Sequence, residues 1–478
     1  MSRAGEPPRG RGATIDRRGV LAGAGAFAAA MTAKAAAAPL RFPDGFVWGT
    51  ATSAYQIEGR AGRRGECIWD TFCRQPGKIR DGANGDVACD HYHRYRDDVA
   101  LMASGAIAAY RFSVAWPRVL PDGTGAPDEA GLDFYDRLTD ALLAAGIAPW
   151  VCLYHWDLPQ RLQDRGGWGS RDIAGWFADY AVLMARRLGD RAHDWVMLNE
   201  PSVHALIGHG LGEHAPGLTS PTAMFAAMHH QNLAQGRALA ALRGLGGKRL
   251  RLGTVLSLQP VRPVGGLAEN QGAAALWDAL WNRGYLDPLF HGRYPPLMAR
   301  DLDKLVQPGD LDTIRQKLDF LGVNYYSRMY RRTEAGGFLG TSWGALPPGT
   351  RTTGMGWPIE PDGLAEVLLD LRDHYGNPPV YITENGVSFP EARGSSGRVD
   401  DTARIAFLRD HLAAAHRALI EGADLRGYFA WTILDNFEWA WGYTAPFGLV
   451  RVDRATLGRE PKASFDWFAR VIRGNSID

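Results

Sequence analysis

Trp195-Val-Met-Leu-Asn199-Glu200-Pro201 and Val380-Tyr-Ile-Thr383-Glu384-Asn385-Gly386 are two apolar runs that each carry a glutamate where a turn begins. Short runs rich in Val, Ile, Tyr and Trp predict buried strands, and Pro201 and Asn385-Gly386 predict where those strands stop. Each carboxylate is therefore expected at the carboxyl end of a buried strand. Two carboxylates held in this way are the minimum that cleavage of a glycosidic bond requires.

Eight such runs occur along the chain: Phe46–Thr52, Ile107–Val114, Ala148–Tyr154, Trp195–Asn199, Leu250–Leu258, Phe320–Tyr326, Val380–Glu384 and Gly427–Ile433. Helical patterns lie between most of them, for example Asp133–Ala145 and Ile173–Leu188, where apolar residues recur at three- and four-residue spacing. Alternating strands and helices predict a parallel sheet, and eight units predict a closed (β/α)8 TIM barrel of the α/β class. An open doubly wound sheet is the alternative, which the count of eight and the lack of a Gly-rich phosphate loop after the first strand disfavour.

The length of 478 residues does not require several domains, because α/β barrels run long as single units. No low-complexity linker follows Pro39, so residues 39–478 are predicted to form one glycosidase domain. The long intervals after the fourth to sixth strands predict extended βα loops, such as Gly336–Trp357, around one rim of the barrel.

Charge is unevenly distributed along the chain. The formal net charge is +1, of which residues 1–38 carry +4, so the remainder carries −3. A nearly neutral body lacks the basic face that a nucleic-acid partner needs.

Residues 1–38 have the order of an export signal, with a basic region, an apolar region and a small-residue site. Arg17-Arg18 precedes the weakly apolar stretch Val20–Ala33, and Ala36-Ala37-Ala38 offers a cleavage site before Pro39. The segment resembles a twin-arginine signal, although Asp16 stands where Ser or Thr is usual; a disordered Ala-rich tail is the alternative. The apolar stretch is too short for a permanent membrane helix. The mature protein is therefore expected in the periplasm or outside the cell, with no membrane association after signal removal.

The four cysteines do not predict a metal site. Cys152 lies inside a strand-like run and is expected to be buried. Cys67, Cys73 and Cys89 are close enough in sequence to pair after export, but their spacing fits no metal-site pattern. No metal or organic cofactor is predicted.

The ends of the predicted strands carry hydrogen-bonding, charged or aromatic residues. In chain order they are Gln56, Arg111, His155-Trp156, Asn199-Glu200, Tyr326, Glu384 and Trp431. Because the chemistry of such barrels lies at the carboxyl ends of the strands, these side chains are expected to converge on one rim.

These residues stand in segments that resemble glycoside hydrolase family one, the β-glucosidase family, from about Phe42 to Phe468. The matching motifs include Tyr154-His155-Trp156-Asp157-Leu-Pro159, Asn199-Glu200-Pro201, Gly322-Val-Asn324-Tyr325-Tyr326, Ile382-Thr383-Glu384-Asn385-Gly386 and Trp431-Thr-Ile-Leu-Asp435-Asn436-Phe-Glu438-Trp439. The ordered series, more than any one motif, makes the resemblance specific.

The resemblance implies a retaining β-glucosidase that acts on terminal β-D-glucosyl residues, with galactosyl or fucosyl units as further substrates. It assigns Glu200 as general acid/base and Glu384 as the nucleophile of a covalent two-step mechanism. Their carboxyl groups should then lie ~5–5.5 Å apart. Arg111 is placed to keep Glu384 charged, since a nearby cation lowers a carboxyl pKa, and Tyr326 could donate to the same group. Asn199 fits the sugar 2-hydroxyl.

The resemblance also implies a set of substrate-binding residues. They are Gln56, His155, Trp156, Asn199, Asn324, Trp431, Glu438, Trp439 and Phe447. Relatives that act on 6-phosphorylated sugars depart from the acidic Glu438-Trp439 pair, because a carboxylate beside a phosphate costs electrostatic energy. An unphosphorylated sugar is therefore favoured over a 6-phospho-β-glycoside.

Two further functions are compatible with the same barrel. A catalytically silent sugar-binding barrel would be expected to lack one or both glutamates, whereas a mainly transglycosylating enzyme would keep them.

Three residues depart from those frequent in the family: Ser202, Pro446 and Arg293. Ser202 is expected near the leaving-group side, so the aglycone is open, as are the linkage preference and the oligomeric state.

Overall fold

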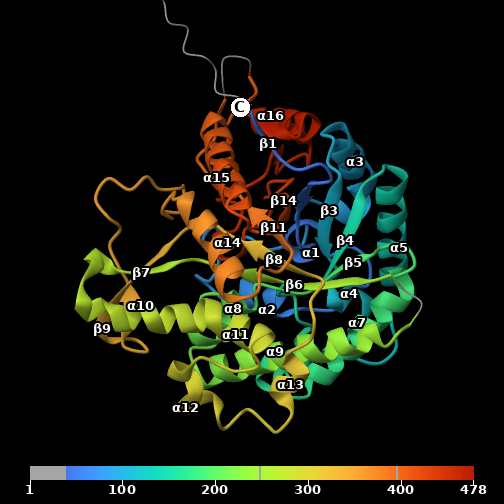
Figure 1. Cartoon of the computed structure of the whole chain (residues 1–478). Coiled ribbons are helices and arrows are strands. Elements are labelled where there is room, and N and C mark those ends of the chain that lie inside the picture. The colour runs from blue at the N-terminus through green and yellow to red at the C-terminus, as the bar shows by residue number, and fades with distance from the viewer. Residues whose placement is uncertain (1–38, 247–248, 394–396) are drawn as a thin grey trace, which may run out of the picture. The chain divides into compact units, whose positions relative to one another are not determined.

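Eight parallel strands close into a barrel in the order β2-β3-β4-β5-β6-β8-β11-β14, with β14 returning to β2 (Figure 1). The computed structural model describes residues 39–246, 249–393 and 397–478, so the predicted export signal lies outside the described residues. The strands are β2 Val47–Ala51, β3 Ala109–Ser113, β4 Ala148–Tyr154, β5 Asp194–Asn199, β6 Arg251–Ser257, β8 Phe320–Asn324, β11 Val380–Asn385 and β14 Leu425–Trp431. Each corresponds to one predicted run, and the predicted (β/α)8 barrel is confirmed.

Strand β8 ends two residues before its predicted run. The run predicted to reach Tyr326 leaves the sheet after Asn324, where the Tyr325 amide donates to the Glu384 carbonyl at 3.0 Å. This turn brings Tyr326 to the rim beside Glu384.

Aromatic rings fill the interior of the barrel. The Trp150 ring, 1% exposed, lies with its centroid 4.9, 4.8 and 5.0 Å from those of Phe320, Tyr381 and Phe429. Glycine makes room for them, since a Cβ on Gly49 would lie 2.4 Å from the Phe429 ring. The barrel is thus a packed core, and a ligand can only be accommodated at its mouth.

Helices follow the strands and surround the barrel (Figure 1). The longer ones are α3 His91–Ser104, α5 Glu129–Ala144, α7 Ile173–Leu188, α9 Pro221–Arg243, α14 Asp362–His374, α15 Thr402–Ile420 and α16 Ala463–Gly474. Helix α7 has the predicted bounds. Helix α5 begins four residues before its predicted start because Asp128 caps it, accepting a hydrogen bond from the Ala130 amide at 3.2 Å.

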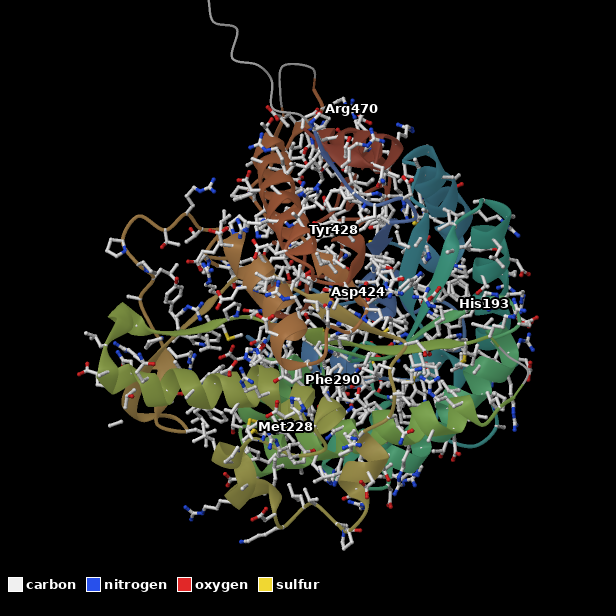
Figure 2. All side chains as sticks on the ribbon, in the orientation of Figure 1. His193, Met228, Phe290, Asp424, Tyr428 and Arg470 are labelled. Carbon is white, nitrogen blue, oxygen red and sulfur yellow. The ribbon has the colours of Figure 1, made fainter. Side chains whose placement is uncertain are left out.

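Buried side chains join the barrel to this helical layer (Figure 2). Tyr428, on β14, is buried and its ring centroid lies 6.2 Å from that of Phe468 on α16. Trp48, on β2, lies 6.0 Å from the same Phe468 ring. These contacts fix α16 against two adjacent strands, β14 and β2.

A small second sheet decorates the rim of the barrel. It has the order β10-β9-β7, formed by β7 Val261–Pro263, β9 Met329–Phe338 and β10 Thr341–Trp343. Part of the predicted excursion Gly336–Trp357 therefore forms strands, and some of its residues, Trp343 and Trp357 among them, line the pocket described below.

All four cysteines are unpaired. Cys152 is buried as predicted, and the pairing left open for Cys67, Cys73 and Cys89 does not occur.

Within the described ranges no helix combines the length and apolarity needed to span a membrane. Nor do the described His, Cys, Asp and Glu side chains form a group of three that could hold a metal ion.

Candidate active site

A pocket of about 500 Å³ opens at the carboxyl ends of the barrel strands. Glu200 and Glu384 both line it, together with His155, Trp431 and Glu438. Two carboxyl groups predicted from separate runs therefore face one cavity. A volume of this size lies in the range of pockets that hold drug-sized ligands.

Glu200 stands at the junction between β5 and a short helix. Its φ of 47° is left-handed, and Pro201 begins α8 Pro201–Val203 directly after it. The backbone amide of Glu200 donates to the Val255 carbonyl of the neighbouring strand at 2.9 Å. The side chain is 6% exposed and lines the pocket. The sharp turn predicted from Pro201 thus presents the carboxyl group at the rim.

Glu384 is held by two donors. Arg111, on β3 and fully buried, forms an ion pair with Oε1, and the Tyr326 hydroxyl donates to Oε2 at 2.6 Å. Both contacts were predicted from the strand-end residues. They hold the carboxyl group of Glu384 in one orientation toward the pocket.

A network of amides links the two carboxyl groups. Asn324 donates to Glu200 Oε1 at 3.0 Å and to Asn199 Oδ1 at 3.1 Å, and accepts from the Thr383 hydroxyl at 2.8 Å. Arg111 donates to the same Asn199 oxygen at 2.9 Å. The side-chain oxygens of Asn199 and Asn324, two residues expected to bind substrate, therefore already accept hydrogen bonds within the protein.

His155, which lines the pocket, holds a donor without a partner among the described residues. Asn199 Nδ2 donates to His155 Nε2 at 3.0 Å, which assigns the proton to Nδ1, and Nδ1 has no partner among the described residues. Burial, together with the charge of Arg111, holds the pKa of His155 well below its usual value, so the ring is neutral. A neutral donor in the wall suits a sugar hydroxyl.

Burial raises the pKa of both catalytic carboxyl candidates. For Glu200, burial and then the charge of Glu384 raise the pKa to about 8, against hydrogen bonding from Asn324. For Glu384, burial also raises the pKa, whereas Arg111 and Tyr326 lower it. The expected effect of Arg111, which lowers the pKa of Glu384, is therefore present, and it opposes the larger effect of burial.

Glu438 lines the pocket, and Gln56 holds it through a hydrogen bond. Gln56 Nε2 donates to Asn436 Oδ1 at 3.0 Å, to the Phe437 carbonyl at 2.9 Å and to Glu438 Oε2 at 3.3 Å. Gln56 is fully buried behind Glu438, which itself lines the pocket. Burial, then the charge of Glu384, raises the pKa of Glu438 to about 8. The electrostatic argument against a phosphate therefore applies fully only above that pH.

The predicted aromatic residues gather around the same pocket. The His155 ring centroid lies 5.8 Å from that of Trp431 and 5.7 Å from that of Trp439, and Trp156 lies 4.7 Å from Trp439. Phe447 lies 6.1 Å from Tyr326 and also lines the cavity. Such faces suit the C–H surfaces of a pyranose ring.

The outer wall contains residues that the sequence did not single out. They come from helices, strands and a loop outside the barrel: Val203, Ile207, Trp281, Met329, Trp343 and Trp357. Ser202, expected near the leaving-group side, does not line the pocket; it is 1% exposed, and its neighbour Val203 takes that place. The predicted excursion could have indicated Trp343 and Trp357, because both aromatics lie within or at the end of it.

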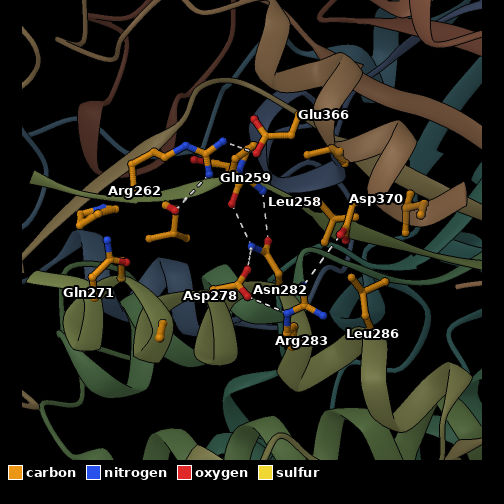
Figure 3. Close-up of a pocket in the computed structure, with 17 residues that line it drawn as sticks. Leu258, Gln259, Arg262, Gln271, Asp278, Asn282, Arg283, Leu286, Glu366 and Asp370 are labelled. Atoms are coloured by element: carbon orange, nitrogen blue, oxygen red, sulfur yellow. Dashed lines mark hydrogen bonds and ion pairs between the residues drawn. The ribbon is translucent and has the colours of Figure 1, made fainter. Parts of the chain in front are cut away.

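Gln259 lines both this pocket and a second cavity of about 320 Å³, whose residues Figure 3 shows. Asn282 holds Gln259 through two backbone hydrogen bonds, accepting from its amide at 3.1 Å and donating to its carbonyl at 2.8 Å. Asn282 also donates to Asp278, which pairs with Arg283 at 2.7 Å. These contacts anchor the π-helix η5 Ala279–Arg283, and with it Trp281 in the active-site wall.

The arrangement can perform acid–base and nucleophilic chemistry at one bond. Burial and the nearby charge of Glu384 raise the pKa of Glu200, so Glu200 suits the role of proton donor. Glu384, held by a cation and a phenol, suits an ionised attacking group. A pair of unlike carboxyl groups in one pocket is what hydrolysis of a glycosidic bond needs.

Comparison with known proteins identifies the family. The family model described as Glycosyl hydrolase family 1 matches residues 38–477. Thermostable beta-glucosidase B of Thermobispora bispora is 48% identical over 100% of this chain and 98% of its own length. Beta-glucosidase A of Acetivibrio thermocellus is 43% identical over 92% of this chain and 99% of its own.

A solved structure agrees with the sequence comparison. The family 1 b-glucosidase from Thermotoga maritima is 40% identical, covers 92% of this chain and 100% of its own, and superposes with a TM-score of 0.87. The fold, the ordered motifs and the two glutamates in one pocket agree with these matches. The chain is a glycoside hydrolase that belongs to glycosyl hydrolase family 1.

Proposed function

We propose that the chain is a retaining β-glucosidase that releases terminal β-D-glucosyl residues from the non-reducing ends of β-linked oligosaccharides and from aryl or alkyl β-glucosides. The observation that carries the proposal is the unlike environment of the two carboxyl groups. Glu384 is paired with Arg111 and Tyr326, whereas burial and the charge of Glu384 raise the pKa of Glu200 to about 8.

In the first step, the Glu384 carboxylate attacks the anomeric carbon while Glu200 donates its proton to the leaving oxygen. The glycosidic C–O bond breaks, the aglycone leaves as an alcohol, and the sugar is joined to Glu384 as an ester. Arg111 and Tyr326 favour the ionised form of Glu384 before attack.

In the second step, Glu200 removes a proton from water, whose oxygen attacks the anomeric carbon and releases Glu384 as a carboxylate. The role of Glu200 changes because Glu384 is uncharged in the ester. The charge that raised the pKa of Glu200 is then gone, so Glu200 can remain ionised and act as a base.

The residues that line the pocket are proposed to bind the sugar. The Nδ1–H of His155 and the carboxyl group of Glu438 face sugar hydroxyls, and Trp431 and Trp439 contact the ring. Gln56, Asn199 and Asn324 orient these groups from behind. The relative from Bifidobacterium breve, named a bifunctional beta-D-glucosidase/beta-D-fucosidase and 45% identical, supports fucosides as further substrates.

Replacing the nucleophile tests the mechanism. Glu384→Gly should abolish hydrolysis of an aryl β-glucoside, and added azide or formate should partly restore turnover with inverted stereochemistry at the anomeric carbon. The exposed Glu421→Gly, at the end of α15, is the matched control and should keep wild-type turnover. Wild-type turnover in Glu384→Gly would rule out the assignment.

A silent sugar-binding barrel is the competing function, and the presence of both glutamates disfavours it. Long incubation with cellobiose decides between the two. Glucose release supports the enzyme, whereas binding without release supports the silent barrel.

Export is proposed from the sequence of residues 1–38, with Arg17-Arg18 as the recognition pair and a mature protein that begins near Pro39. Amino-terminal sequencing of protein recovered from the native host tests this. A chain that retains Arg17-Arg18 in the periplasmic or secreted fraction would contradict the predicted cleavage.

A further inference from the structure

Arg331 is a buried cation that the proposed mechanism does not use. The side chain is 1% exposed, and its Nε and Nη1 have no hydrogen-bond partner among the described residues. Among the described residues, the side chain makes one hydrogen bond, from Nη2 to the Thr341 hydroxyl at 3.2 Å. Burial lowers the pKa of Arg331 to about 9. A buried charge without a carboxylate is costly, so other contacts must offset that cost.

Two tryptophan rings supply those contacts. The Arg331 guanidinium carbon lies 3.4 Å from the centroid of the Trp277 ring and 4.4 Å from that of Trp343. The two rings lie 5.2 Å apart at an angle of 54°, with the cation wedged against both. Cation–π attraction is strongest for tryptophan and increases when the pair is desolvated.

The backbone register explains why Trp343 meets Arg331. The two residues stand directly opposite each other in the antiparallel pair of β10 and β9, so their side chains share one face of the sheet. Thr341 strengthens the cluster, since its hydroxyl also accepts from Trp277 Nε1 at 2.7 Å.

The chain after Trp343 is equally constrained. The Gly344 amide donates to the Tyr330 carbonyl at 2.9 Å, and a Cβ on Gly344 would lie 1.8 Å from the Val264 side chain. Only glycine permits this approach. The Trp343 ring is therefore held on one face by Arg331, and the backbone after it is held by the contacts of Gly344.

This fixed ring is exposed at the mouth of the active-site pocket. Trp343 is 51% exposed and lines the same cavity as Glu200 and Glu384, whereas Trp281 and Trp431, deeper in the wall, are 5% and 4% exposed. A cavity of about 500 Å³ extends beyond the space of one pyranose ring, because such pockets hold drug-sized ligands. An immobile, half-exposed aromatic face at the outer end suits an amphipathic ring, with one side apolar and the edge in water.

We propose that Trp343 is an outer saccharide platform. It stacks against the second glucosyl unit on the leaving-group side of the cleaved bond in a β-linked gluco-oligosaccharide, and Arg331 positions its ring. The proposal rests on the proposed β-glucosidase function and names the substrate length that the outer wall recognises.

Substrate length provides the test. Cellobiose places one unit beyond the cleaved bond and cellotriose places two, so only cellotriose should reach Trp343. Trp343→Ala should lower kcat/KM for cellotriose roughly tenfold, mainly through KM, and leave cellobiose and p-nitrophenyl β-glucoside within about twofold. Trp343→Phe, which keeps an aromatic face, should recover most of the loss.

The positioning role of Arg331 has its own readout. Arg331→Met should reproduce the selective rise of KM for cellotriose, while kcat on p-nitrophenyl β-glucoside stays unchanged. Trp176→Ala is the matched control, because Trp176 also stacks on an arginine, Arg165 at 4.0 Å, but does not line the pocket. It should change no substrate ratio. If Arg331→Met does not fold, Trp343→Ala and Trp343→Phe decide the proposal.

Three outcomes would overturn the platform. They are an equal loss on cellobiose and cellotriose in Trp343→Ala, an unchanged cellotriose reaction, and a loss on octyl β-glucoside as large as that on cellotriose, which would indicate a general contact with apolar aglycones. Failure of the β-glucosidase proposal appears separately, as a wild-type protein that hydrolyses none of these glucosides.

Discussion

Asn324 donates a side-chain hydrogen bond to Oε1 of Glu200 at 3.0 Å. The Thr383 hydroxyl fixes the orientation of the Asn324 amide from its other end. A donor to a carboxylate favours the ionised form, so this contact lowers the pKa of Glu200 against burial and against the charge of Glu384. Asn324 therefore limits how far the pKa of the proton donor rises.

Removing this donor should move the basic limb of the pH profile. In Asn324→Ala the pKa of Glu200 rises further, so the proton donor stays protonated to higher pH and the basic limb of kcat/KM shifts upward. The rate should fall about tenfold to a hundredfold, the value of a hydrogen bond to a charged group. The control is Asn377→Ala. Asn377 precedes β11, and its side chain donates a hydrogen bond to the Gly422 carbonyl, which the variant loses. A basic limb that stays in place would contradict the role of Asn324.

Arg111 should control the acidic limb instead. Arg111→Met removes a contribution that lowers the pKa of Glu384, so that pKa rises and the acidic limb of kcat/KM moves to higher pH. We expect a rate loss of about 10²–10³, as for removal of a preorganised charge-stabilising donor. Steady-state kinetics on an aryl β-glucoside across pH measure both effects.

Arg118→Met separates this effect from lost stability. Arg118 is also buried and forms an ion pair, with Glu58 Oε2 at 2.8 Å, but it does not line the pocket. Loss of either arginine leaves a buried carboxylate unpaired and should destabilise the fold by about 3–5 kcal/mol. Only Arg111→Met should move the acidic limb; a shift in both variants would make it a consequence of stability.

The inner half of the site could be predicted because its signals are local. A run of β-forming residues fixes a strand, the following turn fixes its end, and parallel strands in a barrel bring Glu200, Glu384 and Arg111 to one rim. The pKa of Glu384 could not be predicted in the same way. It depends on the balance between burial and paired charges, which only the packed structure determines.

The outer wall could not be predicted because its residues depend on long-range register. Trp281 lies in a helical segment whose apolar pattern indicates a core face, and its place in the pocket follows from the contact between Asn282 and Gln259. Trp343 meets Arg331 only once β9 and β10 have paired. Ser202 itself does not line the pocket, whereas the adjacent Val203 does.

Glu438 should make discrimination against phosphorylated sugars depend on pH. With a pKa raised to about 8, Glu438 ionises between about pH 7 and pH 9, while a sugar phosphate, with a second pKa near 6, is doubly charged throughout. The kcat/KM ratio of an aryl β-glucoside to its 6-phosphate should rise roughly tenfold over this range. Because the ionisation of Glu200 and Glu384 affects kcat/KM for both substrates alike, its effect cancels in the ratio.

The matched variant is Glu438→Gln, which cannot ionise. Its ratio should stay flat across the same range, although its rate on both substrates falls. A wild-type ratio that is independent of pH would show that Glu438 does not exclude the phosphate by charge.

Asp157 should make the stability of the fold fall as pH rises. Burial, with the charge of Glu58 adding to it and Arg64 opposing it, raises the pKa of Asp157 from 3.8 to about 8. Neither carboxyl oxygen accepts a hydrogen bond from another described side chain. Because the folded state holds the proton more tightly than the unfolded state, this stabilisation is complete below about pH 4 and is lost as pH rises toward 8.

Asp157→Asn keeps the shape of the side chain without the ionisation. The free energy of unfolding of the variant should match that of wild type near pH 4 and exceed it by up to about 4 kcal/mol near pH 7. Wild type loses stability over these pH units because folding must keep Asp157 protonated, whereas the variant has no such proton to hold. Denaturant unfolding at both pH values measures the difference, with the exposed Asp44→Asn as control. An equal change at both pH values would mean that Asp157 is already ionised in the folded protein, because only a proton held by the fold makes the difference grow with pH.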